Sequence, residues 1–390
     1  MTLHLAYSPS LESIDALKST KLPIVSFDTT PDIDFGPTQK PDAILQNHGI
    51  HGVQDMCNLL IRHSKPFLIV AGHWQDKTTL SKLIDKIKSA LIAYTISNMK
   101  VGRVGAPFKG MGDFCISQEA LKKIGIEVYQ FTDEEGKKIK KEISEKEVKE
   151  EYDKMHKIFN VDKKAIEALK HSINTGLIIR KWLEKFGLSS FSVNFQEVGN
   201  FETLETMPFL EASLAMARGI GYAGEGDVLT ASLVGSIMKA YPETTFTEMF
   251  CPDWKGNQVF LSHMGEWNIM LSHKKPNLKE YNFIFGKAKN PVRALGCLKS
   301  GKANIINLSP IKDNNLRLII VKGIMETPKR KDNMADTVHG WFKPNVKITD
   351  LLSSYSELGG THHSALVYGD VAESIKDFGK LMGWEVCIIS

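Results

Sequence analysis

The runs LPIVSF (residues 22–27) and KPFLIVAG (65–72) decide the fold class, because each is a short apolar stretch of the kind that forms a buried strand. An amphipathic segment through residues 59–61 lies between them, and apolar residues three or four apart predict a helix over 77–97. Another strand-like run, KVGRVG, follows at 100–105. Strands that alternate with helices in this way predict an α/β fold with a parallel sheet and helices on its faces.

The middle of the chain continues this alternation after a highly charged segment. Residues 133–170 carry many acidic and basic side chains, which predicts a solvated helical connector with ion pairs between successive turns. A helix over 162–186 is a stronger prediction, because its apolar residues form one stripe and Gly187 can end it. The strand FSVNF and two further helices are expected at 191–195, from Pro208 to Gly219 and from Val228 to Ala240.

The segment 244–271 is rich in β-forming residues. TFTEMF (245–250) and QVFLSHM (258–264) flank the turn-forming CPDWKGN, so we predict a hairpin. Beyond Pro291, the runs ANIINLSPI, LRLIIVKGIM and EVCIIS predict a mostly β C-terminal domain.

Composition limits the class of partner. The 390 residues are 42% apolar and 24% charged, which is typical of a globular protein of roughly two to three domains. A net charge of +4 is too small to favour nucleic acid or an anionic membrane as partner, so a small neutral or weakly anionic ligand fits better. No apolar run reaches the roughly 18 residues of a membrane helix, and no secretory signal is evident, so we expect a cytoplasmic protein.

The cysteines predict no cross-link. They are scattered and lack CxxC spacing, so we expect neither a disulfide framework nor a thiolate zinc site, but buried thiols. The five are Cys57, Cys115, Cys251, Cys297 and Cys387.

Two glutamates are candidates for chemistry. Glu225 lies between Gly224 and Gly226 where a helix is expected to begin, so its carboxylate could face an open space. It could equally be a helix cap, a role for which Asp227 competes. Glu248 lies inside a β run, where a carboxylate must face solvent, a partner or a metal ion.

Histidines could complete a metal site. His263 lies on the return strand of the predicted hairpin, near Glu248, although a lone strand histidine is more often a core residue. His362 and His363 follow two glycines, and because adjacent strand residues point to opposite faces, we expect at most one of them to face a given site. Two carboxylates and two imidazoles suit Mn²⁺, Co²⁺ or Mg²⁺ better than a structural zinc ion.

Ordered sequence blocks add a resemblance to a known family. Their order and spacing resemble those of the bacterial L-arabinose isomerases, so the chain is identified as a short, N-terminally reduced member of the arabinose and fucose isomerase superfamily. The blocks are QNHGIHGVQD (46–55), AGHWQDK (71–77), FSVNFQEV (191–198), GIGYAGEGD (219–227), FTEMF (246–250), LSHM (261–264) and GGTHHS (359–364).

The resemblance implies roles for particular residues. The two glutamates would bind a divalent ion, Mn²⁺ in that family, and would also form the catalytic acid/base pair. The implied metal ligands are Glu225, Glu248, His263 and His363. The implied substrate-binding residues are His51, Phe195, Phe246 and His362, of which His51 would reach a neighbouring subunit's active site.

The resemblance also implies an architecture and an assembly. A reduced Rossmann-like domain is expected over 1–105, a second α/β domain over 106–242 and a β-rich domain over 243–390. The expected assembly is a homotrimer or homohexamer with active sites at the subunit interfaces.

Departures from the family concern the substrate. The chain begins roughly half a domain late relative to the arabinose isomerases, and Met249 and Phe250 replace their usual residues after the metal glutamate. We therefore expect a retained metal site with a different substrate rim, and L-arabinose is not assumed.

The expected activity is the metal-dependent interconversion of an aldose and a ketose through an enediolate, with a glutamate pair that moves the proton. One alternative is a rearrangement or decarboxylation of a sugar acid by the same residues. Another is a sugar-binding relative without catalysis, against which the four filled ligand positions argue.

Overall fold

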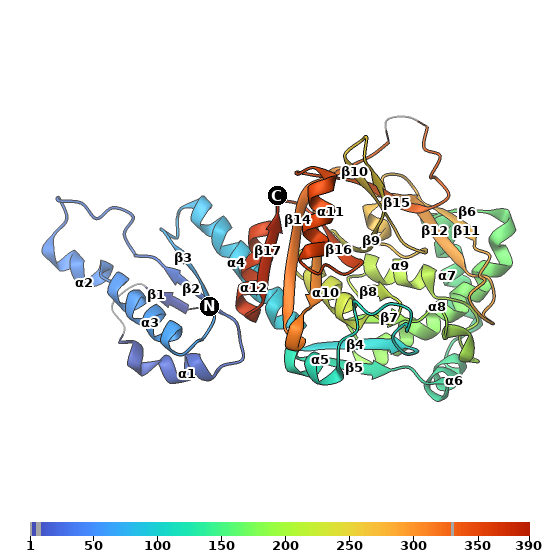
Figure 1. Ribbon diagram of the computed structural model, residues 1–390. Helices are drawn as coiled ribbons and strands as arrows, with labels where there is room; N and C mark the ends of the chain where they lie inside the picture. Colours follow the sequence, from blue (N-terminus) through green and yellow to red (C-terminus); the bar gives the residue numbers. More distant parts are fainter. Residues whose placement is uncertain (1, 5–8, 329–330) are drawn as a thin grey trace. The chain divides into compact units, whose positions relative to one another are not determined.

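The computed structural model describes residues 2–4, 9–328 and 331–390 and divides into two compact units (Figure 1). The smaller unit comprises the chain up to Thr95 together with Glu373–Glu385, and the larger unit comprises Ile96–Ala372 with Val386–Ser390. The three-part division expected from the sequence stays a prediction.

The smaller unit is built on a three-stranded parallel sheet of order β1-β2-β3. Alternate residues of β2 point to opposite faces: Val25 and Phe27 pack with Leu83, whereas Ile24 packs with Leu60. Helices therefore cover both faces of a parallel sheet, as predicted. The elements are β1 (Thr2–His4), α1 (Ile14–Ser19), β2 (Ile24–Asp28), α2 (Ile44–Asn47), α3 (Ile50–Arg62), β3 (Phe67–Ala71), α4 (Lys77–Ile96) and α12 (Ala372–Met382).

The larger unit begins with a four-stranded parallel sheet of order β5-β4-β7-β8. The helices predicted over 162–186, 208–219 and 228–240 are confirmed with small shifts of their ends, and Gly187 ends the first of them with a φ of 62°. The elements are β4 (Met99–Val104), α5 (Gln118–Ile124), β5 (Ile126–Gln130), α6 (Asp133–Lys141), α7 (Glu145–Ile158), α8 (Ile166–Phe186), β7 (Ser190–Val193), α9 (Phe209–Ala217), β8 (Gly221–Gly224) and α10 (Val228–Met238).

The charged segment is helical, as predicted, but it is not merely a solvated connector. Met155 of α7 is fully buried against the main core, and Glu151 forms an ion pair with Arg180 of α8 at 2.8 Å. Arg180 also binds the buried Glu211 of α9 at 2.7 Å. The expectation was wrong because an apolar side chain and one shared arginine, rather than the exposed pairs, fix the position of α7.

The C-terminal part is a mixed sheet of ten strands in which the predicted hairpin is confirmed as β9–β10. Because β15 pairs with both β10 and β14, the strands β14, β13, β16, β9, β10 and β15 close into a ring of antiparallel pairs. The elements are β6 (Asn160–Val161), β9 (Thr244–Asp253), β10 (Gln258–Ser262), β11 (Asn277–Glu280), β12 (Val292–Cys297), β13 (Gly301–Pro310), β14 (Leu316–Glu326), β15 (Val338–Pro344), α11 (Ile348–Glu357), β16 (His363–Tyr368) and β17 (Glu385–Ile389).

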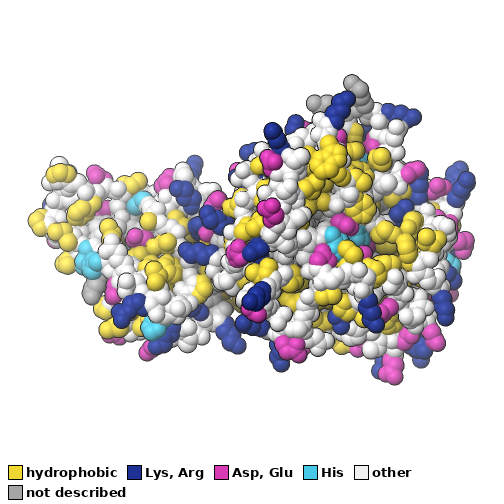
Figure 2. Space-filling model, viewed as in Figure 1, with side chains coloured by type: hydrophobic (Ala, Val, Ile, Leu, Met, Phe, Trp, Pro, Cys, Tyr) yellow, Lys and Arg dark blue, Asp and Glu magenta, His cyan; other side chains and the backbone are white. Residues whose placement is uncertain are grey.

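The surface mixes both signs of charge, as the small net charge suggests. Figure 2 shows lysine, arginine and acidic side chains interspersed on the face in view, with one gathering of histidine and acidic groups on the larger unit. Among the described residues, no helix combines the length and the apolar character that a bilayer span requires.

The cysteines correct one expectation. No disulfide joins any two of them, but they are not buried thiols: Cys115 and Cys251 are exposed, and the others are partly buried. The exposed pair lies in a loop after β4 and in the outer half of β9, where the chain leaves the core.

Candidate metal and active site

Helix α10 lies where the parallel sheet meets the ring of antiparallel strands. Every residue of α10 is buried, and the helix packs against β7 and β8 of the parallel sheet and against β9, β13 and β16 of the ring. A helix that is buried all round is typical of such a central position. The turn before it, residues 225–227, therefore faces both layers.

Glu225 occupies this turn in an unusual backbone conformation. Its φ is 63°, and that of Gly226 is 79°, so two successive residues are left-handed. This conformation costs a non-glycine residue roughly 1–2 kcal/mol and is concentrated at functional sites. The alternative that Glu225 caps the helix is wrong, because Asp227 is the N-cap: its Oδ1 accepts from the Thr230 N–H at 2.9 Å.

Strand register brings Glu248 to the histidines. Glu248 of β9 lies directly opposite His363 of β16 and, on its other side, opposite Ser262 of β10, the residue before His263. Residues opposite each other in an antiparallel pair share a face, so the Glu248 and His363 side chains point the same way. The hairpin thus places Glu248 and His263 near each other, as the sequence predicted.

Three side chains converge closely enough to share one ion. Glu225, His263 and His363 each offer a ligand atom, and these atoms lie within 4.8 Å of one another. His363 donates from Nδ1 to Asp227 Oδ2 at 3.0 Å, and its buried Nε2 has no hydrogen-bond partner among the described residues. An imidazole whose Nδ1–H is held by a carboxylate presents an Nε2 lone pair, as metal-binding histidines do.

His263 is held in the same manner by a residue that the sequence analysis missed. Its Nδ1 lies 2.8 Å from Glu266 Oε2, which also accepts from the Gly265 N–H, while Glu266 Oε1 accepts from the Tyr222 hydroxyl at 2.9 Å. Burial raises the pKa of Glu266, but His263 and these hydrogen bonds outweigh it and lower the pKa overall. Gly224 leaves room for the ring, since a Cβ there would lie 2.7 Å from His263 Cε1.

The charges of the cluster fit a divalent cation. Burial raises the pKa of the Glu248 carboxyl; the three neighbouring histidines lower it and Glu225 raises it, and the net pKa is above the usual value. Two carboxylates beside imidazoles that present bare nitrogens are costly to bury unless a cation joins them. Oxygen and nitrogen donors without a thiolate suit a hard or borderline ion.

Comparison with known proteins matches two domain families to this chain. The L-arabinose isomerase central domain matches residues 116–242, and the L-arabinose isomerase C-terminal domain matches residues 243–385. The chain belongs to the L-arabinose isomerase family. The resemblance found in the sequence blocks is thereby confirmed.

The relatives in this family are distant but cover most of the chain. The L-arabinose isomerase of Shouchella clausii is 25% identical over 98% of this chain and 79% of its own length. L-arabinose isomerase 1 of Bacillus licheniformis is 27% identical with the same coverage, and the L-arabinose isomerase of Levilactobacillus brevis is 27% identical over 90% of this chain and 74% of its own.

His362 corrects a further expectation from the sequence. It precedes β16 rather than lying in it, so the alternation of strand side chains does not apply, and both histidines face the cluster. Their ring centroids are 4.1 Å apart, and His362 Nε2 lies 3.5 Å from Glu225 Oε2. Burial lowers the pKa of His362, but Asp113 and Glu225 outweigh it and raise it to about 10.

A loop after β4, residues 105–117, covers the cluster and was missed from the sequence. Asp113 Oδ2 accepts from the His362 backbone N–H at 2.9 Å and binds its Nδ1 at 2.7 Å. Phe114 stacks on His363 with ring centroids 5.4 Å apart, and the Phe108 N–H donates to the Glu225 carbonyl at 2.8 Å. The available signal was topological: this loop leaves the carboxyl end of a parallel strand, where α/β proteins place their sites.

The two aromatic residues expected to line the sugar pocket occupy different surroundings. Phe246 is buried edge-on against the His263 and His363 rings, with centroids 4.7 and 5.0 Å away, so it supports the imidazoles. Phe195 follows β7, is partly exposed and contacts Phe108 and Phe285. Contact of either residue with a sugar stays a prediction.

His51 lies in the smaller unit, on the first turn of α3, and is exposed. Its ring centroid is 5.1 Å from that of His48. The role that the isomerase resemblance implies for it, in a neighbouring subunit's site, stays a prediction.

Proposed function

We propose that this chain is a divalent-metal-dependent aldose–ketose isomerase that acts on a sugar through an enediolate. Glu225 and Glu248 would form the acid/base pair and, with His263 and His363, hold the ion. The observation that carries the proposal is the convergence of Glu225 with His263 and His363, whose buried Nε2 has no partner among the described residues. Glu248 is not part of this close group, but it lies opposite His363 in the strand pairing. A protein that only bound sugar would not need both carboxylates.

The chemistry divides between the ion and the protein. A bound divalent ion supplies Lewis acidity to the carbonyl of the sugar, which makes the neighbouring C–H more acidic. One glutamate removes that proton and a carboxylate returns it to the adjacent carbon. Glu248, whose pKa is raised, is suited to hold the proton between the two steps.

His362 has a separate part in this proposal. Because Asp113 and Glu225 hold it protonated, it can donate a hydrogen bond to the oxygen on which negative charge develops. Asp113 fixes the direction of its ring and so acts as a positioning residue. His362 therefore belongs with the substrate, and His363 with the ion.

The substrate is proposed to be a sugar, and L-arabinose is not assumed. Phe250, which replaces a usual family residue beyond the metal glutamate, is exposed, and its ring centroid is 6.5 Å from that of His263. Mn²⁺, Co²⁺ or Mg²⁺ suits the donors. We also propose a Rossmann-like smaller unit, a trimeric or hexameric assembly and a cytoplasmic location.

One experiment tests the activity against its rivals. The chain is incubated with a panel of aldoses, ketoses and sugar acids, with Mn²⁺ and after chelation, and products are identified by NMR. We expect aldose–ketose pairs only when Mn²⁺ is present. Loss of CO₂ or a changed carbon skeleton would favour the sugar-acid rearrangement instead, and no turnover of any compound would favour a non-catalytic relative.

A further inference from the structure

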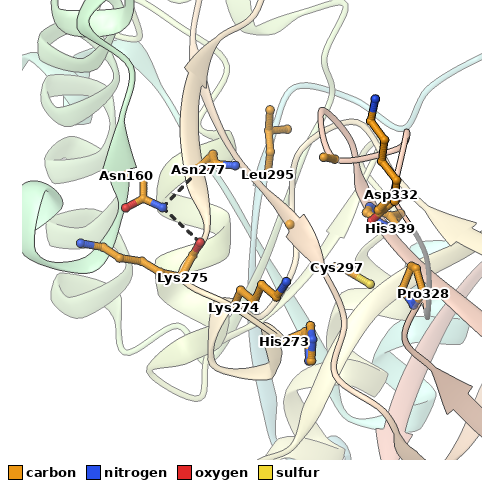
Figure 3. A pocket seen from close by; sticks show the side chains of 13 residues that line it. Asn160, His273, Lys274, Lys275, Asn277, Leu295, Cys297, Pro328, Asp332 and His339 are labelled. Atoms are coloured by element: carbon orange, nitrogen blue, oxygen red, sulfur yellow. Dashed lines mark hydrogen bonds and ion pairs between the residues drawn. The ribbon is translucent and has the colours of Figure 1, made fainter.

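A cavity of about 520 Å³ lies in the C-terminal sheet, apart from the Glu225 cluster (Figure 3). It is lined by residues of β11, β12 and β15 and of the segment between β14 and β15. Cys297 at the end of β12 and His339 of β15 are Cα partners in a parallel pairing. His339 and Glu248 lie opposite Ser262 from its two sides, so two strand spacings, roughly 10 Å, separate them.

Three different ligand types meet in this cavity. Cys297, Asp332 and His339 each offer one atom, a sulfur, an oxygen and a nitrogen, and these atoms lie within 4.8 Å of one another. Cys297 is distant in the chain from the other two, which are seven residues apart, and the pairing of β12 with β15 brings Cys297 beside His339. Their convergence is therefore a product of the sheet pairing.

The contacts of His339 place a proton on its Nδ1. His339 is almost fully buried, and its Nδ1 lies 3.2 Å from the Thr337 carbonyl and 3.3 Å from Thr337 Oγ1. That hydroxyl already donates to the Met334 carbonyl at 2.7 Å, so both neighbours of Nδ1 accept and the proton lies on Nδ1.

The other nitrogen, Nε2, lies 2.8 Å from Asp332 Oδ2, a carboxylate that only accepts. A neutral imidazole cannot satisfy both contacts. A second proton on His339, or one cation that both Nε2 and Oδ2 bind, would satisfy the pair.

We propose that Cys297, Asp332 and His339 bind a second divalent ion, of the borderline type that accepts sulfur, nitrogen and oxygen together, such as Zn²⁺ or Co²⁺. On binding, the Cys297 thiol releases its proton to solvent and the sulfur bonds to the ion. His273 is the candidate for a fourth ligand: it lines the cavity and its backbone N–H donates to the Cys297 carbonyl at 2.8 Å.

The site is placed to fix residues 331–337, the segment that directly precedes β15. Asp332 is the ligand that this segment contributes, whereas the other two belong to paired strands. Ion binding would thus join the segment to the sheet.

An anion is the competing occupant, because Lys274, Lys275 and Lys331 also line the cavity. In Figure 3 the Lys275 side chain extends away from Cys297. An anion beside Asp332 would be unfavourable, because it would add another negatively charged acceptor next to the carboxylate that already faces Nε2. The contacts of His339 therefore favour a cation.

Co²⁺ distinguishes this site from the Glu225 cluster. A thiolate bound to Co²⁺ gives a near-ultraviolet charge-transfer absorption, which oxygen and nitrogen ligands do not give. Titration of the full chain with Co²⁺ should produce this absorption with a stoichiometry near one. Cys297→Ser should abolish it, and Asp332→Asn should weaken Co²⁺ binding at least about tenfold. Cys251→Ser, which removes an exposed thiol of β9, is the matched control and should keep the absorption.

The opposite results would overturn the proposal. They are no charge-transfer absorption at saturating Co²⁺, an absorption that survives Cys297→Ser, or one that Cys251→Ser removes. If Cys297→Ser does not fold, Asp332→Asn and His339→Gln test the site instead, and their folding is checked by circular dichroism. Co²⁺ binding that neither variant weakens would then overturn the proposal. A melting temperature that inorganic phosphate raises and Co²⁺ does not, in a Glu248→Gln background, would identify an anion site instead.

Discussion

The cluster around Glu225 and the cluster around Cys297 each set a buried imidazole beside a carboxylate, yet their surroundings differ. The first draws its residues from the turn after β8 and from three strands of the ring, and both of its buried histidines have an acidic partner on Nδ1, Asp227 and Glu266. The second has one histidine, held by a backbone carbonyl, and adds a thiol. Paired carboxylates that can exchange a proton suit turnover, whereas a sulfur ligand suits retention of an ion.

The largest difference between the clusters should appear in catalysis. Glu225→Gln and Glu248→Gln keep the side-chain shape but remove a base, so each should reduce kcat roughly 100-fold or more, with KM changed much less. Cys297→Ser should leave kcat close to that of the wild type. Steady-state kinetics with Mn²⁺ on the substrate found in the panel measures both. Near-normal turnover of either glutamine variant would exclude that glutamate as the base.

The second prediction is that the Glu225 cluster, unlike the Cys297 cluster, needs a residue from another subunit for activity. If His51 acts in trans, His51→Ala and Glu248→Gln should each be inactive alone and should regain part of the activity when their subunits exchange, because some sites then combine both intact residues. Full activity of His51→Ala alone, or no recovery despite proven exchange, would contradict a shared site.

The carboxylate partners of the histidines provide an intermediate effect. Asp227→Asn keeps an N-cap oxygen for α10, since asparagine caps as well as aspartate, but it removes the negative charge behind His363. Mn²⁺ affinity, measured by calorimetry, should fall about 10–100-fold while the melting temperature of the metal-free chain changes little. Asp162→Asn is the control, because Asp162 is also a helix cap but its side chain accepts from the Lys164 N–H and not from a histidine. This variant should leave Mn²⁺ affinity unchanged.

The smallest expected effect is on stability, and it compares the clusters directly. An ion that binds only the folded chain stabilises it by about 1.4 kcal/mol when its free concentration is tenfold above Kd. Mn²⁺ should raise the melting temperature through the first cluster, and Glu248→Gln should remove that rise. A further rise with Zn²⁺ should disappear in Cys297→Ser and persist in Cys251→Ser. If the two cysteine variants showed the same rise in melting temperature with Zn²⁺, Cys297 would not be a ligand of that ion.

The features that could be predicted from the sequence are those that neighbouring residues determine. The run LPIVSF, the stripe of α8 and the alternation around Glu248 specify strand or helix from nearby residues, so the α/β class and the β9–β10 hairpin could be predicted. Glu225 and His263 are candidates from the residues alone, but the resemblance to the isomerase family is needed to choose them over a helix cap and a core histidine.

What was missed depends on pairing between distant segments. Asp113 meets His362 only because the loop after β4 lies over the ring, and Glu266 becomes a partner of Tyr222 only once β8 packs beside the hairpin. Closure of the ring by β14 and β15, and the meeting of Cys297 with Asp332, have no local signature. Spacing rules for cysteine sites assume neighbouring ligands, so they exclude a site that the fold assembles.

Closure of the ring has a consequence for how the Glu225 cluster comes into being. Strand β9 is bonded on both sides, to β16 and β10, so it has no open edge along which to slide. A shift of one residue would turn Glu248 to the opposite face and would require both ladders to break. Opening of the ring would therefore separate the ligands in one step. As the ring opens, ion binding should be lost in a single cooperative transition and not gradually.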